Sequence, residues 1–104
     1  MGTSYNLIIT EGAQIDILDA SDWYEQQKKE LGKLFMLAID KCINLILNNP
    51  FSFALFYLQI RKANTNKFPY SIYFQIDESN KTVTIFAVTH GHRNEDSWKK
   101  RIDK

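Results

Sequence analysis

The residues best suited to chemistry lie near the C-terminus, where a predicted strand ends at His90 and is followed by His92 and Arg93. A histidine can act as a general acid or base near neutral pH, and Arg61, Lys67 or Arg93 could hold a phosphate beside it. Such a set would suit cleavage of RNA with the 2′-hydroxyl group as nucleophile. The alternative is that Arg61 and Arg93 bind carboxylates of this chain or of a partner. On the residues alone, both interpretations stay open.

Metal-dependent and cofactor-dependent chemistry is not expected. His90 and His92 could chelate an ion, but the sequence holds no third histidine to complete a closed site. A carboxylate of Glu95 or Asp96 could contribute, although two solvated histidines in a surface loop are the simpler interpretation. The chain has no Gly-rich phosphate loop, no Gly-x-Ser-x-Gly motif and no paired cysteines, so we expect no cofactor.

Length and composition predict one soluble domain. The chain has 104 residues, of which 44% are hydrophobic and 24% charged, enough for a single core. The lone Cys42 cannot form an internal disulfide and is expected to be a buried, inert thiol in a reducing cytoplasm. No secretory signal is evident, and the apolar run from Leu34 to Leu47 is too short to span a bilayer. We therefore expect a cytoplasmic protein with no membrane partner.

Charge is unevenly distributed along the chain. The formal net charge is +1, but residues 1–50 hold four lysines against seven carboxylates, and residues 51–104 hold nine Lys or Arg against five. The C-terminal half could therefore meet an anionic partner. It is not basic enough to demand nucleic acid, because proteins that bind a phosphate backbone are usually far more basic.

The N-terminal half predicts a strand and two helices. Tyr5–Ile9 is a short strand, Thr10 can cap a helix from about Glu11 to Glu30, and Gly32 can end that helix. A second helix is expected from Lys33 to Asn48, before Pro50. In the first helix, helical spacing predicts a core-facing stripe of Ala13, Ile17, Ala20 and Tyr24. The carboxylates expected on the solvent side are Asp16, Asp19, Asp22 and Glu25.

The C-terminal half predicts three strands and a helix. Ala54–Lys62 is expected as one strand, and 68–77 and 81–90 as a hairpin around the turn 78–80. A last helix is expected from Asn94. The predicted order is β-α-α-β-β-β-α, an α+β fold in which a helical hairpin packs on a twisted antiparallel sheet. By period-two alternation, one face of the first hairpin arm comprises Phe68, Tyr70, Ile72, Phe74 and Ile76, and one face of the second comprises Val83, Ile85 and Ala87. Tyr57 and Tyr73 are expected on the face opposite the helices.

Short motifs occur in a characteristic order over nearly the whole chain. They are Tyr5-x-Leu7, Ala20-x-x-Trp23-Tyr24-Glu25, Leu31-Gly32-x-x-Phe35, Asn49-Pro50, Ile60-Arg61-Lys62, Phe68-Pro69-Tyr70, Ala87-Val88-x-His90-x-x-Arg93 and Trp98-x-x-Arg101. With these motifs the chain resembles the ParE/RelE superfamily of toxins. The resemblance implies the toxin of a type II toxin–antitoxin module, silenced by a small antitoxin that wraps around it.

The superfamily has two branches, one implied to cleave mRNA in the ribosomal A site and one implied to poison DNA gyrase without a nuclease site. The ribonuclease branch places cations on the exposed face of its sheet, where this chain, aligned on strands, has Tyr57, Gln59 and Ser71. Only Arg93 keeps its charge, and stabilising a phosphorane-like transition state is electrostatic work. The resemblance therefore favours the gyrase branch and a protein that is not an enzyme.

Two alternatives remain beside gyrase poisoning. One is a ribosome-dependent mRNA endonuclease with His90, His92, Arg93 and Arg61 as its catalytic residues; the other is an inactive toxin-like binding module. The expected partners are the antitoxin and gyrase, or the ribosome and mRNA under the first alternative. A complex with the antitoxin is expected, with a homodimer as a further state. The residues expected to contact the target or the antitoxin are Arg61, Lys67, Tyr73, Arg93, Trp98 and Arg101.

Overall fold

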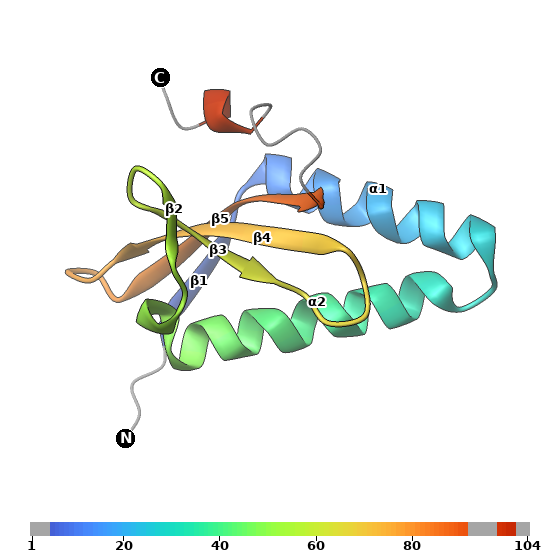
Figure 1. Cartoon of the computed structure of the whole chain (residues 1–104), viewed down its shortest axis with the longest axis horizontal. Coiled ribbons are helices and arrows are strands. Elements are labelled where there is room, and N and C mark those ends of the chain that lie inside the picture. The colour runs from blue at the N-terminus through green and yellow to red at the C-terminus, as the bar shows by residue number, and fades with distance from the viewer. Residues whose placement is uncertain (1–4, 92–97, 102–104) are drawn as a thin grey trace.

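The computed structural model has two layers, a pair of antiparallel helices packed along one face of a five-stranded sheet (Figure 1). It describes residues 5–91 and 98–101. The elements in chain order are β1 (Asn6–Ile9), α1 (Glu11–Gln27), α2 (Leu31–Asn48), a 3-10 turn η1 (Pro50–Ser52), β2 (Leu55–Tyr57), β3 (Ile60–Asn64), β4 (Tyr70–Asp77), β5 (Thr82–His90) and a second 3-10 turn η2 (Lys99–Arg101). The α+β class and the strand–helix–helix–strand order are confirmed. The start predicted for the last helix, Asn94, lies outside the described residues.

The sheet is mixed, whereas the sequence predicted antiparallel strands throughout. Its strand order is β1-β5-β4-β3-β2, and β1 runs parallel to β5, with Leu7 opposite Val83. The other neighbours are antiparallel. The helical pair separates β1 from the later strands, so β1 is not bound by hairpin geometry to run against its neighbour.

The two helices meet differently from the prediction. Thr10 caps α1 as expected, since its Oγ1 accepts a hydrogen bond from the Ala13 N–H at 3.2 Å. Gly32 does not end α1 but lies in the first turn of α2, where a Cβ would come within 2.6 Å of the Ser21 carbonyl oxygen. The glycine therefore permits the helices to approach closely. The carboxylate of Glu25, expected in solvent, accepts the Gly32 N–H at 3.0 Å and so helps to start α2 early.

The predicted strand Ala54–Lys62 is two strands joined by a two-residue turn. Tyr57 pairs with Ile60, and Leu58 adopts φ 53° in the turn between them. Positive φ in such turns normally calls for Gly, Asn or Asp, so the sequence carries no local signal for this hairpin.

A β-bulge changes which face β5 presents. Phe74 pairs with Ile85 and Tyr73 with Ala87, which leaves Phe86 as the extra residue. Simple alternation placed Ala87 on the same face as Val83 and Ile85, and that prediction is wrong. Ala87 instead joins Tyr73 on the side away from the helices.

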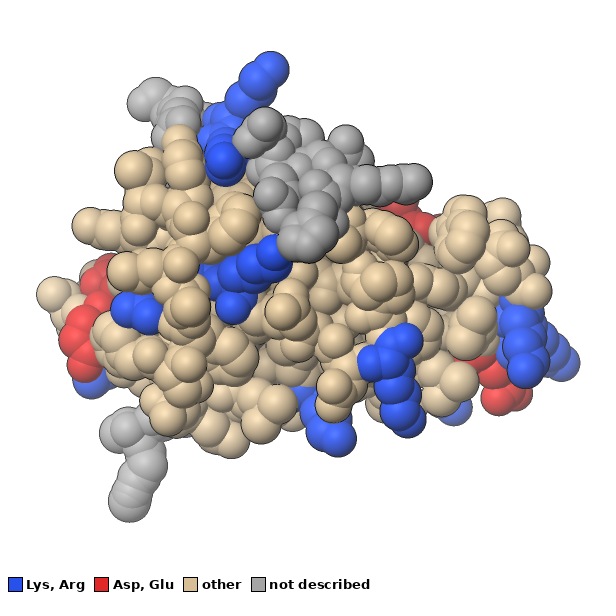
Figure 2. Space-filling model, viewed as in Figure 1, with Lys and Arg blue, Asp and Glu red and all other residues tan. Residues whose placement is uncertain are grey.

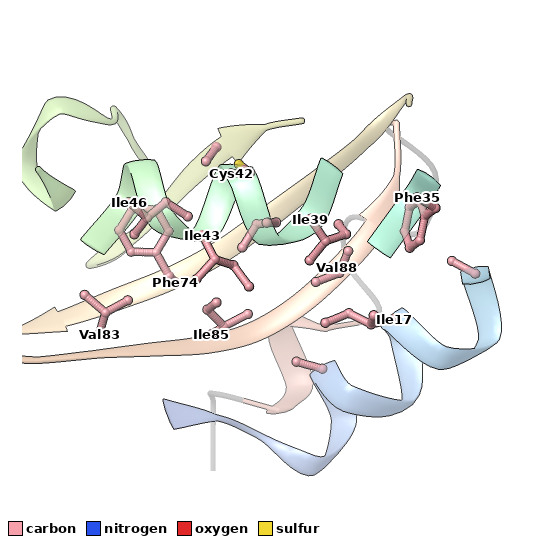
Figure 3. Close-up of a cluster of buried hydrophobic side chains, with 14 residues drawn as sticks. Ile17, Phe35, Ile39, Cys42, Ile43, Ile46, Phe74, Val83, Ile85 and Val88 are labelled. Atoms are coloured by element: carbon pink, nitrogen blue, oxygen red, sulfur yellow. The ribbon is translucent and has the colours of Figure 1, made fainter. Parts of the chain in front are cut away.

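The main core lies between the helices and the sheet. Phe35, Ile39 and Ile46 of α2 are at most 1% exposed, and Figure 3 shows Ile46 beside Phe74 and Ile39 beside Val88 of the sheet. The rings of Tyr24, Phe68 and Tyr70 close one end of this core by packing on Phe35. Ala13, Ile17 and Ala20 are buried as the helical spacing predicted. No helix within the described part of the chain is long and apolar enough to cross a membrane.

Candidate functional site

The sheet face turned away from the helices, here called the second face, carries Ile60, Lys62, Ser71, Tyr73 and Ala87. It has its own small apolar cluster, separate from the main core, in which Ile60, Tyr73, Ala87 and Trp98 are at most 1% exposed. A superfamily nuclease would be expected to work on this face, so its occupants decide what chemistry the chain can perform.

Trp98 covers the middle of the second face. Its ring stacks on that of Tyr73, with centroids 4.4 Å apart, and meets the Tyr57 ring edge-on at 6.0 Å. Trp98 and Tyr73 are both 0% exposed. Tyr73 lies on the face opposite the helices, as expected, and it is buried because Trp98 lies over it. Neither side chain can contact a target or an antitoxin unless the segment 98–101 moves.

An ion pair anchors this C-terminal segment to α1. Arg101 Nη1 lies 3.0 Å from Asp16 Oδ2 and donates to the Phe86 carbonyl at 2.8 Å. Asp16 Oδ2 also accepts the Val88 N–H at 3.0 Å. Because β1 ends opposite Ile85, these two backbone groups on that edge of β5 lack a strand partner, and the two side chains satisfy them. Asp16 was expected on the solvent side, but its side chain is only 17% exposed.

Arg61 is likewise held by the chain itself. It pairs across the ladder with Phe74, on the helix-facing side of the sheet. Its Nη1 donates to the Phe53 carbonyl at 2.6 Å, and its guanidinium lies 5.1 Å from the centre of the Phe51 ring. Arg61 thus ties the segment after α2 to β3 through a backbone carbonyl, whereas the alternative left open by the sequence was a carboxylate of this chain or of a partner.

Of the four predicted nuclease residues, the structure describes His90 and Arg61, and these two lie apart. His90 pairs with Tyr70 and packs edge-on against that ring at 5.3 Å, which places it on the helix-facing side at the sheet rim. Arg61 lies opposite Phe74, four residues from Tyr70 along β4 and thus roughly 13 Å away. His92 and Arg93 lie outside the described residues.

Two lysines that the sequence analysis did not select lie on the second face. Lys62 Nζ is 4.9 Å from the Phe56 ring centre, and Lys99 Nζ is 4.5 Å from that of Tyr57. Lys62 was missed because a single strand over residues 54–62 would place it with the apolar side chains. Because the sequence has no turn signal at Leu58, the position of Lys62 became evident only from the folded β2–β3 hairpin. Both amines lie over aromatic rings, an arrangement that stabilises the cation within the fold.

A small pocket of about 190 Å³ opens beside Lys62. Asn64 and Ser71 line it, and the Ser71 hydroxyl donates to Asn64 Oδ1 at 2.7 Å. The pocket can attract an anion through the lysine. Among the described residues that line it, none is a histidine or a carboxylate to move protons. The pocket is also bordered by Thr65, Phe68, Pro69, Tyr70 and Gly91.

No three His, Cys, Asp or Glu side chains in the described ranges lie close enough to hold a metal ion.

Burial raises the pKa of the Cys42 thiol from its ordinary value near 9 to about 11. We expect alkylation by iodoacetamide at pH 8 to be on the order of a hundredfold slower in the folded protein than in urea, because so little thiolate forms. The raised pKa favours the folded state below about pH 9, and this contribution is lost as the pH rises toward about 11. Equal rates in the native and denatured protein would contradict the buried position.

A family model described as the ParE toxin of the type II toxin–antitoxin system parDE matches residues 7–95. A search of curated protein sequences gave no match. The structure resembles that of a chain in the chromosomal ParDE toxin–antitoxin system from P. aeruginosa, with a TM-score of 0.74 and 16% identity over 86% of this chain and 98% of that one.

Two further solved structures share the fold. One is a chain of the toxin–antitoxin complex RelBE2 from Mycobacterium tuberculosis, with a TM-score of 0.60 and 15% identity over 86% of this chain and 94% of that one. The other is the isolated E. coli RelE toxin, with a TM-score of 0.58 and 17% identity over 95% of this chain and 99% of that one. At these identities the likeness establishes the fold.

Proposed function

The chain belongs to the ParE toxin family of type II toxin–antitoxin systems, and from this premise we propose that it inhibits DNA gyrase by binding, without cutting RNA. It is the toxin of its module, and its natural inhibitor is an antitoxin protein. We propose gyrase as the target and the cytoplasm as the place where the toxin acts.

The observation that carries the proposal is the stacking of Trp98 on Tyr73 at 4.4 Å. It fills the middle of the second face with aromatic rings, where a nuclease would need room for a base and a scissile phosphate. Arg101 is bonded to Asp16 and to a backbone carbonyl, and Arg61 to the carbonyl of Phe53. These guanidinium groups support the fold and would have to leave their partners to stabilise a transition state.

Proton transfer is the second difficulty for a nuclease. General acid–base cleavage needs groups that accept and donate protons at the same phosphate. His90, the imidazole among the described residues, faces the helix side of the sheet and packs on Tyr70. The formal net charge of +1 also makes strong docking on ribosomal RNA unfavourable, since such binding depends on many phosphate contacts.

Ribosome-dependent mRNA cleavage is the second candidate function. The pocket beside Lys62 favours it, because that amine lies on the second face and could attract a phosphate. In this case catalysis would depend on Lys62 together with residues beyond Gly91.

Two assays on the purified toxin separate these functions. We expect inhibition of supercoiling by gyrase and no cutting of mRNA on translating ribosomes. The variant Lys62→Ala, with His90→Ala beside it, should leave the gyrase effect within about twofold of wild type, because neither side chain is assigned to target binding. Message cleavage that is lost in Lys62→Ala would overturn the proposal in favour of the endonuclease. Activity in neither assay would identify an inactive binding module.

A further inference from the structure

The β2–β3 hairpin carries exposed apolar side chains at one edge of the sheet. Leu55 and Leu58 are 60% and 66% exposed, and Phe56 between them is 36% exposed. β2 is the last strand of the sheet, and at about 3.3 Å per residue these three positions span roughly 10 Å of chain. Single exposed apolar residues are common on protein surfaces, whereas a group of neighbours of this kind marks an interaction site.

Leu58 occupies a backbone conformation that leucine rarely adopts. It is the first residue of the two-residue turn between the paired Tyr57 and Ile60, with φ 53°. Such a turn normally takes Gly, Asn or Asp, because at positive φ a Cβ comes too close to the backbone. Three other non-glycine residues in the described part of the chain have positive φ, and all of them are polar, namely Glu30, Lys67 and Lys81. Leu58 therefore combines an unfavourable backbone with an apolar side chain in water.

The fold itself gives no reason for a leucine at this position. Leu58 belongs to neither apolar cluster of the described residues, whereas its neighbour Tyr57 packs on the second face. Gly or Asn would relieve the backbone and would leave no apolar side chain exposed at the turn. Strained residues of this kind gather at sites that contact ligands and partners. We therefore looked for a partner that would make use of the leucine.

The form of β2 argues against pairing with another strand. β2 has only three residues, Leu55–Tyr57, and its register shifts so that Phe56 is an extra residue opposite β3. Short edge strands and bulges prevent edge-to-edge pairing of sheets. The bulge also turns the Phe56 ring toward the second face, 5.4 Å from that of Tyr73. A second copy of this chain is therefore a poor partner for this edge, and recognition depends on the side chains.

The surroundings of the hairpin are basic. From residue 41 to residue 76 the chain contains no Asp or Glu, and Arg61 lies opposite Leu55. Lys99 Nζ lies 4.5 Å from the centre of the Tyr57 ring, and the next residue, Lys100, is exposed. Figure 2 shows largely uncharged surface over the hairpin with cationic side chains beside it. Acidic side chains lie at the left end, where Figure 1 draws the β4–β5 turn, and there they bond to neighbours in that turn. The hairpin thus fits an apolar pocket with an acidic rim.

We propose that Leu58, with Leu55 and Phe56 beside it, binds the protein target of the toxin by inserting into an apolar pocket whose rim carries carboxylates. This inference rests on the proposed function in one respect, that the toxin acts by binding a protein. A nucleic acid fits this surface less well, because its two most exposed side chains are leucines, which neither stack on bases nor bond to phosphates. The hairpin is exposed while Trp98 stays in place, so this contact needs no movement of residues 98–101.

The first test replaces Leu58 by asparagine, which tolerates positive φ. Leu58→Asn should keep or raise the melting temperature and weaken inhibition of gyrase supercoiling at least about tenfold. Leu18→Asn is the matched control, because Leu18 is also an exposed leucine, at 57%, but lies on α1. It should lower the melting temperature slightly, since asparagine is a poor helix former, and leave inhibition within about twofold. A purely structural role of Leu58 would instead make activity follow stability.

The second test changes the charge beside the hairpin. Lys100→Glu should weaken inhibition about threefold to tenfold at low salt and less at high salt, because it opposes an acidic rim. Lys33→Glu, which changes an exposed lysine on α2, should have no such effect. Inhibition that is equally strong in Lys100→Glu and Lys33→Glu at low salt would contradict the acidic rim.

Growth arrest on expression in cells tests the same surface without assuming the target. A Leu58→Asn protein that stays as toxic as the wild type would overturn the proposal. So would a loss of affinity for the antitoxin of the same operon, measured by calorimetry, with growth arrest unchanged. An oligonucleotide that binds the wild type and not Leu58→Asn would overturn it in favour of a nucleic-acid partner. If the wild type fails to inhibit gyrase while Leu58→Asn relieves growth arrest, gyrase is refuted as the target and the binding role of the hairpin stands.

Discussion

Replacing Trp98 by alanine is expected to lower the free energy of unfolding by about 3–5 kcal/mol, the range seen when a large buried aromatic side chain is removed. The indole is 0% exposed and stacks on Tyr73, so its loss leaves a cavity on the second face and uncovers that ring. Urea denaturation followed by circular dichroism measures the change. Trp98→Phe should retain most of the stability, because a ring still covers Tyr73.

Trp23→Ala is the matched control for this variant. Trp23 is the other tryptophan of the chain, but it is 55% exposed on α1 and touches Tyr24 only edge-on, so its removal should cost less than about 1 kcal/mol. A Trp98→Ala protein as stable as Trp23→Ala, yet unable to bind its target, would contradict the structure. It would restore the sequence-based prediction that Trp98 is a contact residue.

Replacing Asp16 by alanine is expected to lower the free energy of unfolding by about 2–3 kcal/mol. Hydrogen bonds to a charged acceptor are among the stronger ones, and the substitution leaves two donors without their acceptor. The Arg101 guanidinium loses its carboxylate, and the Val88 N–H loses its acceptor. The side chains are 17% and 34% exposed, so water will reach part of the site and keep the loss below that of a fully buried pair. Thermal and urea unfolding of the same samples measure the loss.

Asp19→Ala provides the control, since Asp19 lies on the same helix but in solvent. Its removal should change stability by less than about 0.5 kcal/mol. A double-mutant cycle of Asp16→Ala with Arg101→Met then isolates the energy of the pair. If Asp16→Ala behaves like Asp19→Ala, or if the cycle gives additive losses, the ion pair does not anchor the C-terminal segment.

Together the stacking of Trp98 and the Asp16–Arg101 pair hold residues 98–101 over the second face. One contact is apolar and the other ionic, so the two variants should respond differently to salt, with only the ion pair weakened. The second face lies beneath residues 98–101, on the side of the sheet opposite the helices.

Features with local signals could be predicted from the chain alone. The Thr10 cap, the buried positions Ala13, Ile17 and Ala20, and the buried Cys42 follow from helical spacing and capping chemistry over a few neighbouring residues. The ordered motifs along the chain likewise predicted the toxin family, which the match over residues 7–95 confirms. Gyrase inhibition and the contact role of Lys67 stay predictions.

The arrangement of the second face could not be predicted from the chain, because it depends on contacts between distant segments. The turn at Leu58 has no Gly, Asn or Asp, so the local sequence gives no sign of the hairpin between β2 and β3. This hairpin places Lys62 on the second face. The β-bulge at Phe86 places Ala87 on the second face. A prediction from strict alternation cannot include such an inserted residue. Asp16 and Arg101 are 85 positions apart, and they meet because β1 stops short and leaves polar groups of β5 to be satisfied. Local spacing encodes helices and caps, whereas contacts between distant segments depend on strand register and packing, which exist only once the chain has folded.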